Sequence, residues 1–466
     1  MSMVGRGFGG VVVIGGSMAG LLAARVLSEH FEKVVLVERD VRPEGPVARK
    51  GVPQGVHLHV MLDTGRRVLD RWFPGLLEQL RGQGAEFIDS SRDVAWHHFG
   101  VWKLRYTSGV PLLLCTRTLL EWSVLRQVRA RPNIEFREGW SVDGLLTDSG
   151  QRRVTGVRVK GPQGEQTWET DLVVDASGRG SRLPQWLEAL GYGRPEEEHI
   201  LVDLAYTSGL FEPPPHFQRE WKALMLYPCP PTTWRTGFIS SVEGGRWLVT
   251  LNGYFGDHAP NEPEGFLEFA RTLGRPDLYD ALREARALGP LATHKVKESR
   301  WRHYERLPRF PEGLAVLGDA VCAFNPVFGQ GMTVAAQGAE LLDTCLREHA
   351  HAGDLTGLAQ RFRRRLPDVI RWPWFMSSSM DLVYPQAQGR RAPGLGALHW
   401  YLRRMMERTS TDAGVHRQFN RALHLQGGLG TVLHPSVVLP VLLHGARSLV
   451  QPLQSLANTE RRPPAP

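Results

Sequence analysis

Cysteine is scarce in this chain, with four residues among 466: Cys115, Cys229, Cys322 and Cys345. Their spacing contains no Cys-x-x-Cys pair and is too wide for the disulfide frameworks that stabilise small secreted domains. We therefore expect free thiols in a reducing, cytoplasmic compartment, and no metal site built on cysteine.

Long hydrophobic runs are also missing. The first apolar segment, residues 11–14, is too short for a signal peptide, and no basic segment precedes it, so we expect no secretory signal. Residues 432–450 are apolar but contain two prolines, two histidines and an arginine, which a membrane-spanning helix tolerates poorly. We expect this segment to form a helical pair that packs on the protein or lines a hydrophobic substrate entrance, rather than to contact a membrane.

No stretch is dominated by charge of one sign. The 56 Lys and Arg exceed the 48 Asp and Glu by eight, but both signs are scattered, and the longest basic cluster, residues 361–365, contains a phenylalanine. This pattern is typical of a solvated basic surface rather than a nucleic-acid-binding face. The length and a hydrophobic content of 42% predict a globular protein with two or more structural units.

A nucleotide-binding pattern begins at residue 10. An apolar strand, residues 10–14, is followed by the turn GGSMAG at residues 15–20 and by a segment with helical spacing, and a second apolar strand, residues 34–37, ends in Glu38. In such a βαβ unit the small turn residues let the backbone approach a pyrophosphate, and the acid accepts hydrogen bonds from the ribose hydroxyls. Ser17 replaces the usual glycine but is small enough to fit. The carboxylate repels a 2′-phosphate, which favours FAD or NAD(H) over NADP(H).

A second polar segment lies about three hundred residues further on, within residues 313–342. An apolar strand leads into Gly318-Asp319, then into a proline-bearing loop and a helix that begins near Gly331. Asp319 can accept a hydrogen bond from a ribityl hydroxyl. The positive end of the helix suits the flavin edge that becomes anionic on reduction. Because a nicotinamide dehydrogenase has no use for this second anchor, the two segments together predict FAD.

The rest of the chain predicts further sheets and helices. We expect strands at residues 93–114, 201–210, 223–227, 235–241 and 246–251, a hairpin at 154–160 and 166–174, and helices at 60–69, 75–81 and 116–129. The predicted organisation is a discontinuous FAD-binding domain (1–92, 115–198 and 297–352), an inserted substrate-binding antiparallel sheet (93–114 and 199–296), and a C-terminal helical region (353–466). The proline-rich end, residues 461–466, is expected to be disordered.

Five segments in order carry a family resemblance: GGSMAG, ERD (38–40), DLVVDASGRGS (171–181), GDA (318–320) and NPVFGQGM (325–332). They resemble the flavin monooxygenases with the p-hydroxybenzoate hydroxylase fold. RKGVPQ with the two histidines that follow (49–59), Thr116-Arg117 before a helix, and AFNPVFGQGM (323–332) are more narrowly similar to bacterial epoxidases that act on polyene precursors of polyether antibiotics. The resemblance implies an α/β fold with a Rossmann-like FAD-binding domain of the GR2 type.

The resemblance also implies roles for individual residues. Glu38 would bind the adenosine ribose, Arg117 would lie near the pyrophosphate or ribitol, and Asp319 would bind the ribityl chain. Asp175 would lie beside the cofactor, residues 326–332 along the isoalloxazine, and Arg49, Lys50 and Gln54 on a loop that covers the flavin. The predicted cofactor-binding residues are Gly15, Gly16, Ser17, Met18, Ala19, Gly20, Glu38, Arg39, Arg49, Lys50, Val52, Gln54, Arg117, Asp175, Gly318, Asp319, Pro326, Gly329, Gln330, Gly331 and Met332.

The chemistry expected of such a protein belongs to the cofactor. Reduced FAD takes up O2 at C4a, and the flavin C4a-hydroperoxide delivers one oxygen atom, so we assign no catalytic side chain. We expect epoxidation of an alkene in a large hydrophobic polyketide or prenylated natural product. No second nucleotide motif is present, so NADH or NADPH would act as a transient reductant, directly or through a separate flavin reductase.

Several alternatives remain open at this stage. An aromatic hydroxylase shares all the motifs, whereas a flavin-dependent halogenase should carry GWxWxIP, and Trp372-Pro373-Trp374 lacks its glycine and Ile-Pro. A polyprenyl reductase would saturate a double bond without consuming O2, and a non-enzymatic flavoprotein would share only the fold. His57 and His59 lack a third metal ligand, so we expect no metal and predict packing or hydrogen bonding near the flavin loop.

Overall fold

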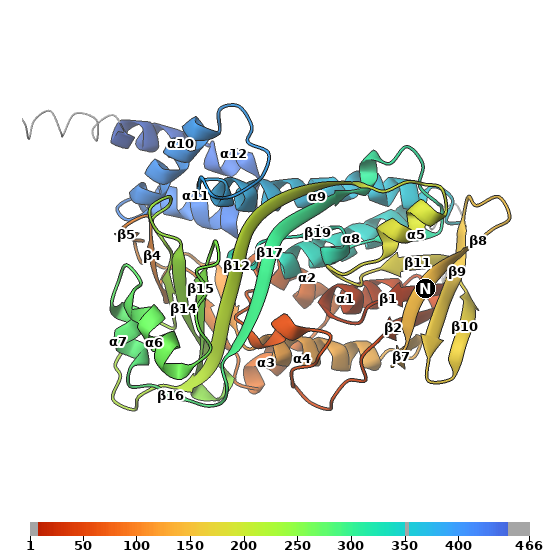
Figure 1. The fold of residues 1–466 in the computed structure, drawn as a ribbon, viewed down its shortest axis with the longest axis horizontal. Helices are drawn as coiled ribbons and strands as arrows, with labels where there is room; N and C mark the ends of the chain where they lie inside the picture. The colour runs from red at the N-terminus through yellow and green to blue at the C-terminus, as the bar shows by residue number, and fades with distance from the viewer. Residues whose placement is uncertain (1–7, 350–353, 446–466) are drawn as a thin grey trace, which may run out of the picture.

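The structure, a computed structural model, describes residues 8–349 and 354–445 (Figure 1). The proline-rich segment 461–466, for which disorder was predicted, lies outside the described residues. Three sheets and a helical C-terminal region make up most of the described chain.

A five-stranded parallel sheet carries the first nucleotide motif. Its strands lie in the order β18 (Leu314–Val316), β11 (Leu172–Asp175), β1 (Phe8–Ile14), β2 (Phe31–Glu38) and β7 (Ile134–Glu138). Val11, Val12 and Val13 of β1 are at most 2% exposed, because helices such as α1 (Met18–Leu27) and α8 (Gly331–His349) pack with this sheet in one core. Burial on both faces explains why these strands are unbroken apolar runs. The strands predicted at 10–14 and 34–37 are confirmed.

A small antiparallel sheet follows, made of β8 (Ser141–Thr147), β9 (Val154–Gly161) and β10 (Gly164–Glu169). The predicted second hairpin arm, residues 166–174, is divided between two sheets. β10 ends at Glu169, and β11 pairs with β1 in the parallel sheet. β10 has exposed and half-buried side chains, as expected in a sheet with one face in solvent. All four residues of β11 are buried, as expected in a parallel sheet that is covered on both faces.

The second large sheet has nine strands and is built around two long ones, β12 (Glu196–Glu212) and β17 (Ala292–His303). Figure 1 shows these two as bent ribbons that extend from this sheet to the region beside α9. The strands predicted between 201 and 251 are confirmed. The other strands are β15 (Arg246–Gly253), β14 (Arg235–Val242), β13 (Ala223–Leu226), β4 (Val94–His98), β5 (Val101–Trp102), β16 (Arg286–Ala287) and β19 (Cys322–Ala323).

Two features of this part of the chain differ from the predicted antiparallel sheet. β13 pairs with β4 in parallel, because no hairpin joins these strands, which lie far apart in the chain. β6 (Pro111–Leu114) leaves the sheet and pairs with β3 (Glu86–Asp89) instead. The long strands extend beyond the predicted bounds of the inserted sheet, residues 199–296, since β12 begins at Glu196 and β17 ends at His303. The division of the chain into domains stays a prediction.

Helices cover the sheets on several sides. The helix predicted at 116–129 is α4 (Arg117–Arg129), and Thr116 caps its start by accepting a hydrogen bond from Leu119 N. The helix predicted from residue 60 begins only at Asp63, because residues 57–60 are not helical. The remaining helices of this part are α2 (Asp63–Trp72), α3 (Leu76–Gly82), α5 (Leu183–Ala189), α6 (Pro263–Arg271) and α7 (Asp277–Leu282).

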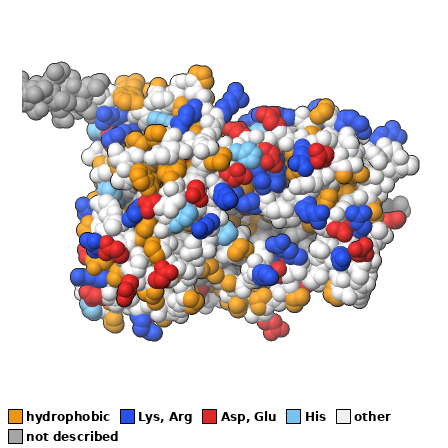
Figure 2. Space-filling view, in the orientation of Figure 1, with side chains coloured by type: hydrophobic (Ala, Val, Ile, Leu, Met, Phe, Trp, Pro, Cys, Tyr) orange, Lys and Arg blue, Asp and Glu red, His pale blue; other side chains and the backbone are white. Residues whose placement is uncertain are grey.

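The C-terminal region is helical, as predicted. α9 (Leu358–Asp381) is followed by α10 (Leu395–Arg408), α11 (Ala413–Leu423) and α12 (Leu429–Val432), and residues 435–445 are also helical. α10 and α11 share a hydrophobic core with β4 and β13. None of the described helices combines the length and the apolar character needed to cross a membrane. Figure 2 shows charged side chains of both signs interspersed over one face of the molecule.

Candidate functional site

Three loops meet where the strands of the parallel sheet end, and close glycine contacts join them. Gly15 has a φ of +95°, and a Cβ added there would lie 2.6 Å from Ala176 O, in the loop after β11. A Cβ at Gly318, whose φ is +67°, would lie 2.8 Å from the Cβ of Ala19. The GGSMAG turn therefore contacts both the DASG loop and the GDA loop, although the three are far apart in the sequence.

Glu38 lies beside this turn at the end of β2. It is 6% exposed, its Oε2 accepts a hydrogen bond from Gly16 N at 3.1 Å, and its Oε1 accepts one from Asp40 N at 3.1 Å. A Cβ added at Gly16 would lie 3.1 Å from Glu38 Oε2, so a side chain there would crowd the carboxylate. Glu38 thus lies at the end of β2 beside the turn, and its binding of ribose stays a prediction.

A buried ion-pair cluster adjoins the turn. Arg49 Nη1 lies 3.0 Å from Glu38 Oε2, and Arg49 Nη2 lies 3.1 Å from Glu121 Oε1. Arg117 pairs with Glu121 at 2.8 Å and donates to Ser17 Oγ at 3.0 Å. Burial alone would raise the pKa of Glu121, but Arg117 and Arg49 outweigh it and hold that pKa at about 2. Arg49 and Arg117 were predicted; Glu121 was missed, although its i,i+4 spacing from Arg117 on α4 is the signal that could have found it.

Arg42, which was not among the predicted residues, has a buried guanidinium at the same turn. It donates to Gly16 O, while its Nε and Nη1 have no hydrogen-bond partner. Burial lowers the pKa of Arg42, and the nearby Arg49 lowers it further. The guanidinium also forms ion pairs, with Nε 3.7 Å from Glu138 Oε1 and Nη2 4.0 Å from Glu38 Oε2. A cation at this place, beside the N-terminus of α1, is complementary to an anion such as a pyrophosphate.

Three residues of the second predicted anchor, Asp319, Gln330 and Gly331, lie close together in the fold. Asp319 lies in the short turn after β18, and its carboxylate makes no hydrogen bond to any described residue. Burial raises the pKa of Asp319. Gln330 is 0% exposed, and neither atom of its amide has a partner. α8 begins at Gly331, where an added Cβ would lie 3.7 Å from Asp319 Oδ1. An unbonded acid, an unbonded amide and a helix start fit the hydroxyl groups and polar ring edge of a flavin.

Other predicted residues have different surroundings. Arg39 and Lys50 are exposed and make no hydrogen bond or ion pair with the described residues. Asp175 turns its carboxylate back on its own loop: Oδ1 accepts from Ser177 N at 2.9 Å, and Oδ2 accepts from Ser181 Oγ at 2.5 Å. Its observed contacts are therefore those of a residue that holds the loop against Gly15.

A hollow of about 440 Å³, partly open to solvent, lies between the loop at residues 42–55 and α4. Val52 and the two predicted arginines, Arg49 and Arg117, line it. Gln54 follows in the short turn Pro53–Val56. The predicted loop therefore borders a space beside the ion-pair cluster.

The two histidines of the loop make hydrogen bonds. His57 Nδ1 lies 2.8 Å from Ser208 Oγ, and His59 Nδ1 lies 3.0 Å from the carbonyl oxygen of His57. Burial lowers the pKa of His57 to about 3 and that of His59 to about 4, so both rings are neutral at physiological pH. Within residues 8–349 and 354–445, no group of three His, Cys, Asp or Glu side chains could hold a metal ion.

The loop before α8 is tied to the nine-stranded sheet and to α9. Tyr227 donates from its hydroxyl to Val327 O at 3.1 Å. Asn325 Nδ2 donates to Tyr254 OH at 3.1 Å and to Asp381 Oδ1 at 2.8 Å. Tyr227, Tyr254 and Asp381 belong to no sequence motif, and only the fold brings them to this loop.

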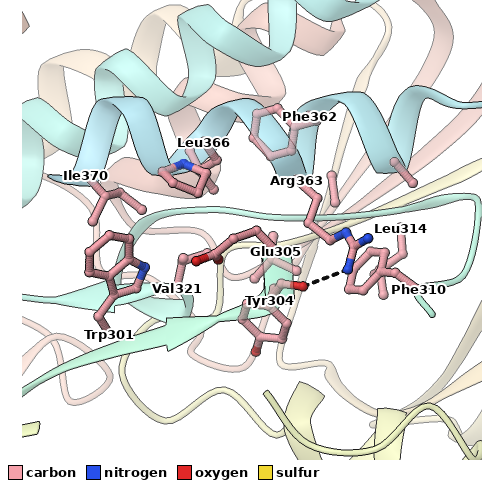
Figure 3. Close-up of a pocket in the computed structure, with 14 residues that line it drawn as sticks. Trp301, Tyr304, Glu305, Phe310, Leu314, Val321, Phe362, Arg363, Leu366 and Ile370 are labelled. Carbon is pink, nitrogen blue, oxygen red and sulfur yellow. Dashed lines mark hydrogen bonds between the residues drawn. The ribbon is translucent and has the colours of Figure 1, made fainter. Parts of the chain in front are cut away.

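Figure 3 shows another hollow, of about 330 Å³ and partly open to solvent, between α9 and β17 with β18. Its lining is mostly apolar, and Arg363 donates to Tyr304 O at 2.8 Å at its edge. None of the predicted cofactor-binding residues lines this space.

Comparison with known proteins agrees with this geometry. Residues 10–185 match the family described as FAD dependent oxidoreductase. Protein Rv3254 of Mycobacterium tuberculosis is 34% identical over 402 residues, 82% of each chain. Kynurenine 3-monooxygenase of Salinispora arenicola is 27% identical over 77% of each chain. Squalene monooxygenase of Mus musculus is 25% identical over 72% of this chain and 54% of that one.

Solved structures share the fold. The structure of p-nitrophenol 4-monooxygenase PnpA from Pseudomonas putida aligns with a TM-score of 0.63 at 19% identity and covers 91% of this chain and 100% of that one. The chain belongs to the FAD-dependent oxidoreductases and, within them, is a FAD-dependent monooxygenase. The predicted fold class is confirmed.

Proposed function

We propose that this monooxygenase transfers one oxygen atom from O2 to a carbon–carbon double bond of a large hydrophobic polyketide or prenylated natural product. The observation that carries the proposal is a cluster of aromatic side chains, with Met225 among them, beside the loop that precedes α8. Tyr227 bonds to Val327 of this loop, and Trp96, Phe238 and Met225 lie on the same sheet. A cluster of this composition is compatible with an apolar, electron-rich substrate and keeps water away from the loop. The mouse squalene monooxygenase, a relative named for an apolar polyene, supports the same class.

We assign the cofactor contacts to residues of both anchors. Glu38 would bind the adenosine ribose, and Arg49 and Arg117 would bind the pyrophosphate together with the GGSMAG turn. Asp319 would bind the ribityl chain, and Gln330 with the start of α8 would bind the polar edge of the ring. FAD, when bound and reduced, supplies the activation of O2. The protein's own task is to orient the substrate and to keep the site dry.

The electrons would come from NADH or NADPH. The chain contains no second nucleotide motif, so we propose either transient binding of the nicotinamide or delivery by a separate flavin reductase. We place the reaction in the cytoplasm, because the four cysteines are free and three of them are buried.

Aromatic hydroxylation is the second candidate. The kynurenine 3-monooxygenase relative is named for an aromatic substrate, and the aromatic cluster is also compatible with a ring. Both reactions add one oxygen atom to the product, so oxygen incorporation does not distinguish them. The class of substrate that supports turnover, polyene or aromatic, does.

The test is a paired substrate screen. Protein reconstituted with FAD is supplied with NADH or NADPH, with and without a flavin reductase, and O2 uptake is followed with a panel of polyenes and a panel of phenols. Epoxidation predicts O2 uptake coupled to a polyene product that opens to a diol in mild acid. Turnover of phenols alone would replace the proposal with hydroxylation. A saturated double bond formed without O2 uptake would contradict both.

A further inference from the structure

Lys103 is buried without a carboxylate partner. The residue directly follows β5 and is 4% exposed. Its backbone N donates to Trp96 O at 2.8 Å, which holds it opposite Trp96 at the end of the nine-stranded sheet. Its ammonium donates to Thr409 Oγ1 at 2.9 Å and lies 3.5 Å from Met406 Sδ. It also lies 5.1 Å from the ring centroid of Trp96 and 4.9 Å from that of Phe419. A buried cation normally has an anion beside it.

The titratable groups around this ammonium are all basic or neutral. Burial lowers the pKa of His98 on β4 and of His416 on α11, and the charge of Lys103 lowers both further, which places them near the ammonium. Burial also lowers the pKa of His97, on the same strand as His98, where Arg275 and Asp277 act on it besides Lys103. His416 is engaged, with Nδ1 3.0 Å from Leu104 O. By contrast, Trp96 Nε1 and His98 Nδ1 are buried and have no hydrogen-bond partner. The Lys103 ammonium, Trp96 Nε1 and His98 Nδ1 thus lie at the same end of the sheet, and none of the three has a carboxylate partner among the described residues.

This end of the sheet is connected to the predicted flavin loop through one residue. The Tyr227 ring lies 5.6 Å from that of Trp96 and 4.9 Å from that of His98, measured between centroids. The Tyr227 hydroxyl bonds to Val327 O in the loop before α8. Met405 and Phe419 close the same cluster from the C-terminal helices. Tyr227 therefore contacts both the loop before α8 and the two rings, Trp96 and His98, at the Lys103 end of the sheet.

We propose that Lys103, with Trp96 and His98, binds the carboxylate of the substrate, and that the substrate is accordingly a hydrophobic polyene acid. The inference rests on the proposed function and adds to it the position of the acid group. An ammonium, an indole N–H and an imidazole N–H can all donate to one carboxylate, and the bound anion offsets the cost of burying the cation. Burial lowers the pKa of Lys103 to about 7, the direction expected for an amine that has no anion beside it.

Binding of cis-parinaric acid, a fluorescent polyene acid, and of its methyl ester tests the proposal. The intact protein should bind the acid at least about ten-fold more tightly than the ester at pH 6.5, because only the acid pairs with the ammonium. This preference should decline as the pH rises and Lys103 loses its proton. Equal binding of the acid and the ester by the intact protein would overturn the proposal.

Two variants separate binding from a structural role. Lys103→Met removes the charge and keeps the volume, and Lys103→Gln also keeps a donor for Thr409. Both should bind the ester as the intact protein does and lose the preference for the acid. The control is Lys222→Met, which removes a half-exposed lysine paired with Glu86 at 2.7 Å and should leave the preference unchanged. Thermal unfolding checks that each variant is folded. If Lys103→Gln kept the preference for the acid, Lys103 would serve only to tie α10 to the sheet, and the proposal would be wrong.

These measurements need no turnover, so their outcome is independent of the oxygenation assay. A lost acid preference in both variants supports the subsite even if no polyene is oxygenated. Oxygenation of neutral polyenes with an unchanged acid preference in the variants would support the proposed function and reject the subsite.

Discussion

Asn325 donates a hydrogen bond from Nδ2 to Asp381 Oδ1 across 2.8 Å, and this bond joins the loop before α8 to the last residue of α9. Asp381 is 1% exposed, and its Oδ2 has no partner. Burial raises the pKa of Asp381 to about 8, although the bond from Asn325 opposes the shift. The folded protein therefore holds this acid protonated at neutral pH, next to the loop that we assign to the flavin ring.

Asp381→Asn should stabilise the protein and flatten part of its pH dependence. The pKa in the folded state lies above that of the unfolded chain, so the folded state holds a proton that the unfolded state releases above about pH 4. Stability is then lost as the pH rises from about 4 to 8, at up to about 1.4 kcal/mol per pH unit for one proton. Urea unfolding from pH 5 to 8 should show this slope in the original protein relative to the variant.

The control is Asp368→Asn, which changes an exposed acid on the same helix, paired with Arg371. It should keep the original pH profile. An unchanged profile for Asp381→Asn would mean that Asp381 is ionised in the folded protein.

Asp319→Ala should lower the affinity for FAD. A hydrogen bond to a charged group contributes about 1.5–3 kcal/mol, which corresponds to a loss of roughly 10- to 150-fold. The measurement is flavin content after purification, followed by titration of the apoprotein with FAD through tryptophan fluorescence. Asp319→Asn keeps an acceptor oxygen, so its affinity for FAD should lie between that of the original protein and that of Asp319→Ala. Flavin retained by Asp319→Ala at the original occupancy would contradict the assignment of Asp319 to the ribityl chain.

Gly20→Ala should severely destabilise the protein. The added Cβ would lie 1.7 Å from Gly15 O, so the turn and the start of α1 could not both keep their positions. We expect a loss of about 3 kcal/mol or more, measured by thermal unfolding. Gly180→Ala is the matched control, because an added Cβ there meets nothing within 4 Å, and its effect should stay within about 0.5 kcal/mol. Equal stability of the two variants would show that the GGSMAG turn has another conformation.

Glu121→Gln tests the ion-pair cluster. Removing this carboxylate leaves Arg49 and Arg117 with one fewer anion, and breaking a buried pair costs about 3–5 kcal/mol. The pKa of Glu121 is depressed in the folded state, so its contribution is present above about pH 4.5 and is lost as the pH falls toward 2. The difference in unfolding free energy between the two proteins should therefore shrink from pH 7 to pH 3. A difference that does not depend on pH would point to packing rather than charge.

The elements of the proposed nucleotide-binding half are predictable from the sequence because their determinants are local. The strand, the turn GGSMAG, the helix and Glu38 lie within thirty residues, and steric limits at Gly15 and Gly20 dictate the turn. Asp319 and the helix from Gly331 form a second local pattern. Short-range sequence patterns therefore predict the strand, turn and helix of each segment, and the tertiary fold brings the two segments together.

The residues of the proposed substrate-binding half could not be predicted in the same way. Lys103, Tyr227 and Asp381 come from three elements separated by more than a hundred residues, and none belongs to a motif. Their chemistry depends on burial and on neighbours that the long strands and the C-terminal helices supply. The parallel pairing of β13 with β4 escaped prediction for the same reason, since no turn joins them.

The central claim is that this flavoprotein inserts one atom of O2 into a polyene. The most direct test supplies FAD-loaded protein with NADH or NADPH, a polyene acid and oxygen gas labelled with the heavy isotope, and measures the product by mass spectrometry. We predict a product that contains one labelled oxygen atom and has lost one double bond. A product without label, or a saturated chain formed without O2 uptake, would contradict the account.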